Sequence, residues 1–173
     1  MNRRSFLTRS LAAAGGAALA PLPGFAAAQE KFDVRNLRIT DLKTFLVDAG
    51  NDENFVYVKI YTNQGITGLG EGTLAAKCLT VATAIGELKR HLVGKDPTEI
   101  ERHWQDIFRG PRYRGGPVLM SALSAIDIAL WDILGQAVGL PIWRLLGGKA
   151  RDRVRLYCHE GYLERISHTK KRR

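Results

Sequence analysis

The chain has 173 residues, of which 45% are hydrophobic and 25% are charged, and these proportions are typical of a globular protein rather than a disordered one. Its formal net charge is +9, but the arginines of the first ten residues carry +3 and the last ten residues carry +4, which leaves +2 for the rest. A nucleic-acid-binding protein gathers positive charge on one folded face, so a charge placed at the two ends excludes nucleic acid as the predicted partner.

The first 28 residues are typical of an export signal. Arg3 and Arg4 precede a short apolar run over residues 11–20, and small residues lead up to Ala28. A charged segment, an apolar segment and a small-residue cleavage site in this order resemble a twin-arginine signal peptide, which predicts cleavage after Ala28 and a periplasmic location. An uncleaved membrane anchor is the alternative, but the apolar run has only half of the ~20 residues that a membrane span needs. Residues 29–36 are interpreted as a linker.

Alternation of apolar and polar side chains then predicts β-strands over residues 37–48 and 54–62. In the first strand Ile39, Phe45 and Val47 lie on one alternation. In the second strand one face consists of Val56, Val58 and Ile60 and the other of Phe55, Tyr57 and Tyr61. A turn at residues 63–65 leads to a third, short strand over residues 66–70. Together the three strands predict an antiparallel meander.

Helical spacing replaces this alternation further along the chain. A first helix is predicted from an apolar stripe and ends at Gly94 and Lys95; the members of the stripe are Leu79, Ala82, Ile85, Leu88 and Leu92. Asp96, followed by Pro97 and Glu99, has the pattern of an N-cap and predicts that a second helix begins at residue 97. Its expected apolar face consists of Ile100, Trp104, Ile107 and Phe108. His91 and His103 are predicted to lie at helix surfaces or at an interface.

A third helix is predicted from Pro117 to Val138, with Gly139 ending it. The segment is long and apolar enough for a membrane span, but Asp127 and Asp132 within it would each cost ~2.5–3.5 kcal/mol at the centre of a bilayer. We therefore predict a buried helix, no stable membrane span, and structural polar contacts for the two aspartates. Two further segments complete the pattern: a last helical turn over residues 142–146 and a strand over residues 153–158. Cys78 and Cys158 are predicted to be buried thiols.

Four ordered motifs carry a family resemblance. The run from Ala122 to Ile133, followed by Gly139-Leu140-Pro141 and Leu145-Leu146-Gly147-Gly148, resembles the signature of the mandelate racemase and muconate lactonizing enzyme group of the enolase superfamily. Residues 65–71 resemble that group's third strand, residues 94–97 its inter-helix turn, and residues 113–117 are similar to sugar-acid dehydratases, with galactonate dehydratase-like proteins nearest. One departure is Gln136, where the family usually has Lys or Arg.

The resemblance implies an α+β fold, in which a three-stranded antiparallel meander is followed by a helical bundle. This enolase N-terminal domain-like unit is expected over residues 37–150, with the first strand of a (β/α) barrel over residues 151–159. In the family the domain caps a barrel that binds Mg²⁺, and its loops close over the substrate. The implied function is therefore substrate capping in a Mg²⁺-dependent sugar-acid dehydratase, a carbon–oxygen lyase acting on a sugar-acid substrate. A racemase, epimerase or cycloisomerase of the same superfamily is an alternative.

Three loops hold the residues that we predict to contact the substrate as a lid. These substrate-lid candidates are Asn51, Asn54, Glu71, Thr73, Tyr113 and Arg114. Asn51, Asn54 and Thr73 are suited to hydrogen bonds with the hydroxyl groups of a polyol acid, while Arg112 and Arg114 are suited to a carboxylate. The alternative for each is a solvated turn residue, for Glu71 a charged cap of the next helix, and for the arginines an ion pair with a nearby acid.

The sequence leaves the family pattern at residue 160, where a basic tail over residues 160–173 begins. The carboxylates and bases that the family carries on later barrel strands have no counterpart, so we predict no catalytic residue, no metal ligand and no cofactor in this chain, and expect Mg²⁺ only in intact relatives. We interpret the break as a frameshift near His159 or Glu160 that leaves a truncated, inactive chain. A non-catalytic capping-domain remnant or interaction module is the alternative. A homo-oligomer is compatible with the sequence, because intact relatives are commonly multimeric.

Overall fold

The computed structural model describes residues 32–48, 54–110 and 112–156. The predicted signal peptide with Arg3, Arg4 and Ala28, the lid candidate Asn51, and all residues from Tyr157 on, including Cys158, lie outside the described residues. The chain divides into two units after Ile142, and each unit is described by itself.

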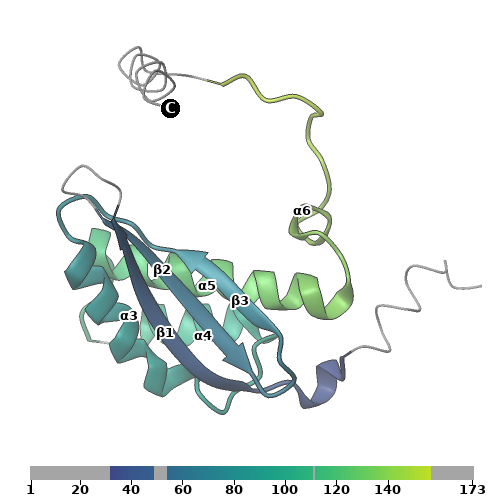
Figure 1. Cartoon of the computed structure of the whole chain (residues 1–173), viewed down its shortest axis with the longest axis horizontal. Helices are drawn as coiled ribbons and strands as arrows, with labels where there is room; N and C mark the ends of the chain where they lie inside the picture. Colours follow the sequence, from purple (N-terminus) through teal and green to yellow (C-terminus); the bar gives the residue numbers. More distant parts are fainter. Residues whose placement is uncertain (1–31, 49–53, 111, 157–173) are drawn as a thin grey trace, which may run out of the picture. The chain divides into compact units, whose positions relative to one another are not determined.

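Three antiparallel strands form the sheet of the first unit, in the order β1-β2-β3 (Figure 1). A short 3-10 helix, η1 (Val34–Asn36), precedes β1 (Ile39–Asp48), and β2 (Asn54–Thr62) and β3 (Thr67–Glu71) follow. The side chains of Val56, Val58 and Ile60 are buried on one face of β2, because a strand places alternate residues on opposite faces. The predicted meander is therefore confirmed.

Strand β1 differs from its predicted alternation of side chains. A register shift lies between Ile39 and Asp41, where the pairing with β2 gains an extra residue. Such a bulge reverses the alternation of side chains beyond it. Ile39 is buried, but the next buried residue is Leu42, while Phe45 is 43% exposed and Val47 is 47% exposed. The prediction that Phe45 and Val47 lie on one alternation with Ile39 is therefore wrong.

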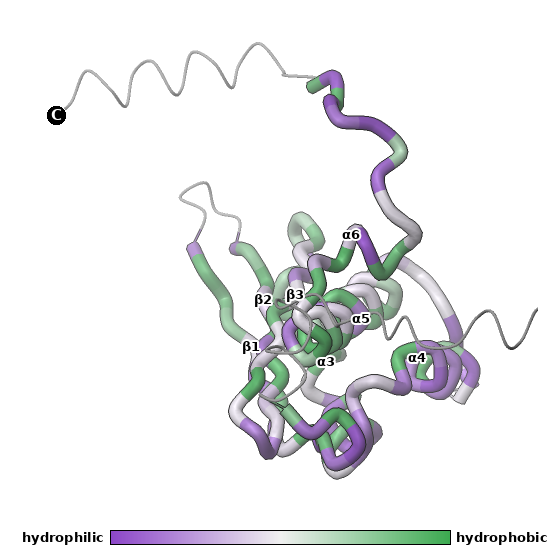
Figure 2. The backbone as a smooth tube through the Cα atoms, turned by 90° about the vertical axis from the view of Figure 1, so that its right-hand side faces the viewer, coloured by the Kyte–Doolittle hydropathy of each residue, from purple (hydrophilic) through white to green (hydrophobic). Residues whose placement is uncertain are grey.

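Helices α3 (Cys78–Leu92), α4 (Ile100–Arg109) and α5 (Pro117–Val138) lie on one side of the sheet (Figures 1 and 2). The predicted bounds of α5 are confirmed: Pro117 occupies its first turn, and Gly139 ends it in the left-handed conformation with φ of 68°. Within the described ranges α5 is the one helix with the length and composition of a membrane span, but nine of its residues are buried in this unit, as in the core helix of a globular protein. The short helix α6 (Ile142–Leu145) follows.

The buried stripe of α3 contains Ile85 and Leu92, as predicted, but differs from the prediction at the start of the helix. Cys78, Val81, Ile85 and Leu92 are buried, whereas the predicted Leu79 is 69% exposed. Ala82 and Leu88 are partly buried at the edge of the core. The apolar pattern of this segment is broad enough to fit two adjacent helix faces, and the contact with the sheet selects one of them.

Helix α4 begins at Ile100, three residues later than predicted. Asp96 forms a turn ahead of the helix instead of capping it: its Oδ1 accepts hydrogen bonds from the backbone N–H of Thr98 at 2.8 Å and from the Thr98 hydroxyl at 2.7 Å. The backbone N–H of Glu99 donates to the Asp96 carbonyl oxygen at 3.4 Å. Asp96, Pro97 and Thr98 thus make a turn with the same local chemistry as a helix start.

Strand β3 and helix α5 approach each other until their backbones touch. A Cβ atom added to Gly68 would lie 2.0 Å from the carbonyl oxygen of Ala129, and one added to Gly70 would lie 1.9 Å from that of Ala125. At Gly72 the corresponding atom is the carbonyl oxygen of Ser121, at 2.8 Å. Glycines two apart on a strand face one side of the sheet, and residues four apart on a helix share a face, so the two patterns fit each other.

Side chains of α5 also bind the free edge of β3. The Leu69 backbone N–H donates to Asp132 Oδ2 at 2.9 Å, and Gln136 Nε2 donates to the Thr67 carbonyl oxygen at 2.8 Å. Asp132 therefore makes the structural polar contact predicted for it, although its partner is a strand rather than a loop. Gln136, the departure from the family pattern, has the same role.

In the second unit, the described residues 151–156 form neither a helix nor a strand. The strand predicted from Arg153 is therefore not formed over Arg153–Leu156, and Val154 and Leu156 are exposed. A parallel strand is held by hydrogen bonds to neighbouring strands, and no described segment pairs with this one.

Candidate functional site

Several substrate-lid candidates lie at one end of the sheet. Asn54 is the first residue of β2 and pairs with Asp48 at the end of β1, while Glu71 is the last residue of β3. The contact between Gly72 and Ser121 places the first turns of α5 beside this end. Tyr113 and Arg114 belong to the loop that precedes α5. The chain therefore brings the end of β1, the start of β2, the β3–α3 connection and residues 112–116 before α5 to a common end.

A hydrogen-bonded turn joins Glu71 and Thr73. The Thr73 hydroxyl donates to Glu71 Oε1 at 2.7 Å and accepts from the backbone N–H of Val56 at 3.1 Å. The backbone N–H of Gly72 donates to the Val56 carbonyl oxygen at 2.9 Å. Both polar groups of the Val56 backbone are thus used by the turn, which extends the pairing of β2 and β3 past the end of the strand.

Glu71 does not cap the following helix, which was the alternative considered for it. The N-cap residue of α3 is Lys77, its side chain makes no capping hydrogen bond, and the first turn of this helix holds no acidic residue. Among the described residues, no ion pair involves Glu71. Its carboxylate is exposed and keeps one oxygen, Oε2, without a hydrogen-bond donor from the described protein.

The first residue of β2 is held by a cysteine. Cys78 is buried, as predicted, and its Sγ–H lies 2.8 Å from the Asn54 carbonyl oxygen and 3.3 Å from that of Leu74. A thiol has one hydrogen and is a weak donor, so the shorter contact, to Asn54, is the better partner. This bond uses the backbone of Asn54 and fixes where its side chain leaves the strand.

Tyr113 and Arg114 border a small cavity of about 40 Å³ between α3, α4 and α5. Its other walls are apolar side chains, among them Leu88, Phe108 and Met120. A pocket that holds a small organic molecule has a volume of roughly 300–1,000 Å³, so this cavity is too small for a sugar acid. Tyr113, Arg112 and Arg114 are exposed, and no ion pair among the described residues includes either arginine.

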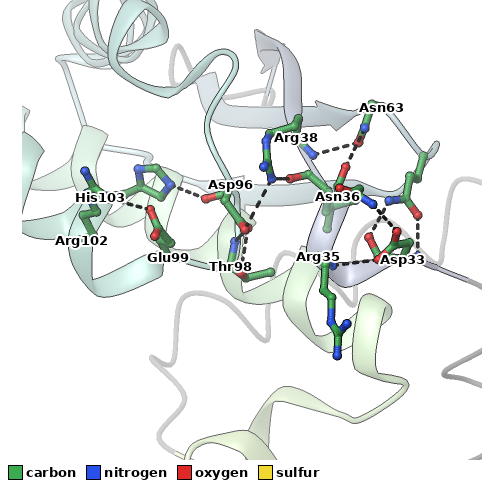
Figure 3. Close-up of polar contacts among 12 residues, drawn as sticks. Asp33, Arg35, Asn36, Arg38, Asn63, Asp96, Thr98, Glu99, Arg102 and His103 are labelled. Carbon is green, nitrogen blue, oxygen red and sulfur yellow. Dashed lines mark hydrogen bonds and ion pairs between the residues drawn. The ribbon is translucent and has the colours of Figure 1, made fainter.

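A second polar network lies at the opposite end of the sheet and connects β1, the α3–α4 turn and α4 (Figure 3). His103, predicted at a surface or interface, is 1% exposed, and its Nε2 lies 2.6 Å from the Asp96 carbonyl oxygen. Its Nδ1 is buried without a partner. The Asp96 carboxylate in turn pairs with Arg38 at 3.6 Å. The surface prediction for His103 is therefore wrong: this histidine holds the turn that precedes its own helix.

The described residues offer no donor set for a divalent metal. Nowhere in the part of the chain that the structure describes do three His, Cys, Asp or Glu side chains converge. Mg²⁺ takes oxygen ligands in octahedral geometry, usually including one or two carboxylates held for that purpose.

Two described carboxyl groups on different elements have shifted pKa values. Lys89 and the backbone of Leu42 lower the pKa of Asp41 on β1, whereas burial and Glu101 raise the pKa of Asp127 on α5.

Comparison with known proteins supports one family. The mandelate racemase / muconate lactonizing enzyme N-terminal domain model matches residues 40–147. The chain is 44% identical over 125 residues to the D-galactonate dehydratase of Ralstonia nicotianae, and 41% identical over 125 residues to that of Cronobacter sakazakii. Each match covers 72% of this chain and 32% of the relative, so the chain spans about a third of the length of these enzymes.

Solved structures agree with this result. An enolase from Pantoea ananatis with bound D-gluconate and Mg matches with a TM-score of 0.67 and 44% identity, over 79% of this chain and 34% of that one. A dehydratase-like protein from Zymomonas mobilis matches with a TM-score of 0.67 and 35% identity, over 70% of this chain and 33% of that one. The enolase N-terminal domain-like fold is therefore confirmed, and the chain belongs to the mandelate racemase and muconate lactonizing enzyme family, of whose galactonate dehydratase-like members it contains the N-terminal domain.

Proposed function

We propose that residues 37–150 are the substrate-capping domain of a Mg²⁺-dependent sugar-acid dehydratase. The identity of 44% with a D-galactonate dehydratase is the observation that carries this proposal. The common placement of Asn54, Glu71 and the residues before α5 at one end of the domain supports it, since a lid excludes water and binds the part of the substrate remote from the reacting atoms.

The proposed reaction removes the proton α to the carboxylate of a sugar acid and expels the β-hydroxyl group. In such a reaction a bound Mg²⁺ would stabilise the negative charge that develops on the substrate carboxylate. The described residues of this chain do not fit a Mg²⁺ site, so we assign them no step at the metal. Their part is to enclose the substrate and to bind its hydroxyl groups.

A chimera tests this function. Residues 40–147 of this chain replace the matching segment of the Ralstonia nicotianae D-galactonate dehydratase. Dehydration of D-galactonate is measured as the rate at which the keto product forms. A working lid is expected to retain activity within about tenfold of the parent enzyme, because specificity lies in the contacts that the lid completes. A folded chimera with no measurable dehydration would count against the capping function.

We also propose that the protein is exported to the periplasm through a twin-arginine signal, on the basis of Arg3, Arg4 and the cleavage pattern that ends at Ala28. The test expresses the full chain with a C-terminal epitope and follows its size and its appearance in the periplasmic fraction. Replacement of Arg3 and Arg4 by lysine keeps the positive charge but removes the arginine pair, and is expected to abolish export. Equal export of both forms would refute the proposal.

A further inference from the structure

We propose that Glu71 accepts a hydrogen bond from a hydroxyl group of a polyol-acid substrate, and that Thr73 is the residue that positions it. The inference rests on the proposed capping function and names the lid residue that selects the substrate. It differs from the expectation that Thr73 itself binds the substrate.

The hydroxyl of Thr73 is already committed within the protein. It donates its single hydrogen to Glu71 Oε1 at 2.7 Å and accepts from the Val56 N–H at 3.1 Å. A hydroxyl group has one hydrogen to donate, so in this arrangement Thr73 has none left for a ligand. Its contribution to a ligand site is therefore to hold the carboxylate of Glu71.

Glu71 has the remaining capacity. A carboxylate has two oxygens that accept about four hydrogen bonds, and the described residues supply one donor, from Thr73. No described cation forms an ion pair with it. The charge also decides which part of a sugar acid it meets: the substrate carboxylate would be repelled, whereas a hydroxyl group donates a short, strong hydrogen bond to a carboxylate. Glu71 therefore fits the polyol chain.

The backbone that follows Glu71 is held by contacts on two sides. The Gly72 N–H donates to the Val56 carbonyl oxygen at 2.9 Å, which attaches the turn to β2. On the other side, a Cβ atom on Gly72 would lie 2.8 Å from the Ser121 carbonyl oxygen and 3.0 Å from the Ala125 Cβ of α5. With the backbone held, the hydrogen bond from the Thr73 hydroxyl restrains the Glu71 carboxylate, and such restraint lowers the entropy cost of ligand binding.

The first arm of the test uses the full chain and measures amide hydrogen exchange at Val56. Thr73→Val keeps the shape of the side chain but removes the hydroxyl, so the Val56 amide is expected to exchange at least about tenfold faster. Thr73→Ser retains the hydroxyl and is expected to restore slow exchange. Unchanged exchange in Thr73→Val would overturn the positioning role of Thr73.

The second arm uses the chimera described above and separates KM from kcat. Glu71→Gln is expected to raise KM for D-galactonate about tenfold with kcat nearly unchanged, because the lost contact is made in both the ground state and the transition state. Thr73→Val should raise KM in the same direction, and Thr73→Ser should reverse it. Glu87→Gln, an exposed glutamate on α3, is the matched control and should change neither constant.

Deoxy analogues of D-galactonate identify the contact; each lacks one of the hydroxyls beyond the β-hydroxyl, which is the leaving group and must stay. For the analogue without the hydroxyl that meets Glu71, the parent chimera and Glu71→Gln should have the same KM. If Glu71→Gln leaves KM for D-galactonate unchanged while the parent chimera is active, the inference is wrong and the capping function stands. If the parent chimera is folded but inactive, the capping function fails first, and the substrate role of Glu71 with it.

Discussion

Gly70 of β3 lies directly against the carbonyl oxygen of Ala125 in α5, with no side chain between them: a Cβ atom on Gly70 would lie 1.9 Å from that oxygen. The same close approach repeats at Gly68 and Gly72. The position of α5, and with it the start of the helix beside the proposed lid, therefore depends on the absence of three side chains.

Gly70→Ala is expected to lower the free energy of unfolding by about 3 kcal/mol or more, because the added methyl group meets helix backbone that cannot rotate away. Urea denaturation of the full chain measures it. Gly86→Ala is the matched control: Gly86 lies inside α3 with open space around it, so alanine should raise the free energy of unfolding by about 0.5–1 kcal/mol. A Gly70→Ala variant as stable as the parent would contradict the close β3–α5 contact.

His103→Leu is expected to lower the free energy of unfolding by about 1–3 kcal/mol. The replacement fills the buried position with an apolar side chain but removes the donor to the Asp96 carbonyl oxygen, which lies 2.6 Å from Nε2. Thermal unfolding followed by circular dichroism measures the loss. His91→Leu removes an exposed histidine from α3 and should stay within about 0.5 kcal/mol of the parent. If His103→Leu is as stable as the parent, the buried hydrogen bond does not hold the turn.

Asp41 is expected to make stability depend on pH in the acid range. The hydrogen bond from Lys89 lowers the pKa of this carboxyl below its ordinary value of 3.8, and the Leu42 N–H contributes in the same direction. Folding therefore favours the ionised form, so the stabilisation is complete above the ordinary pKa and is lost as pH falls through the lower folded value. Asp41→Asn should be less stable than the parent at pH 7, and the difference should close as pH falls through the lowered folded pKa.

The measurement is urea denaturation of the parent and Asp41→Asn at several pH values between 2 and 7. Lys89→Met supplies the control, because it removes the first cause of the lowered pKa. In the Lys89→Met background the Asp41→Asn difference should depend much less on pH. A difference that stays constant down to pH 2 would show that the ion pair does not contribute.

Asp127 is expected to change the pH dependence of stability in the direction opposite to Asp41. Burial first, and then the negative charge of Glu101, raise the pKa of this carboxyl above its ordinary value of 3.8. The folded protein therefore binds the proton more tightly than the unfolded chain, and stability falls as pH rises from 3.8 through the folded pKa. Asp127→Asn, which removes the charge but keeps the shape, should be more stable than the parent at pH 7 and equal to it at pH 3. If Asp127→Asn and the parent are equally stable at both pH values, the ionised Asp127 carboxylate does not destabilise the fold.

Much of the fold follows from local signals in the sequence. Pro117 and Gly139 mark the ends of α5 because each residue has a backbone preference that suits one position only. The alternation of Val56, Val58 and Ile60 predicts β2 because a regular strand preserves it. Where an element is regular and its ends carry such residues, the prediction and the structure coincide.

The differences arise where distant contacts decide. The bulge after Ile39 is set by pairing with β2 and has no signature within the sequence of β1. The regular alternation predicted from the sequence therefore fails beyond Ile39. Asp96 has the chemistry of an N-cap, but its contacts with Thr98 and His103 form a separate turn. Spacing could have indicated the latter contact, since His103 lies one turn inside the helix that follows.

The candidate site was predicted in its location more than in its roles. The order of strands and helices predicts that Asn54, Glu71 and Arg114 lie at or near the ends of elements. It does not predict that Thr73 holds Glu71, because that contact depends on the donor at Val56, 17 residues away from Thr73 in the chain. A sequence pattern identifies hydroxyl and carboxyl groups but does not tell which of them is already occupied.

The contacts of Asp132 and Gln136 with β3 have a consequence for how the protein behaves in concentrated solution. An exposed strand edge offers backbone groups to which a strand of another molecule adds, and this is a common route to aggregation. On β3 the N–H of Leu69 and the carbonyl of Thr67 are already occupied by helix side chains. Growth of the sheet past β3 would first have to displace them, so self-association by strand addition is directed away from this edge and towards β1.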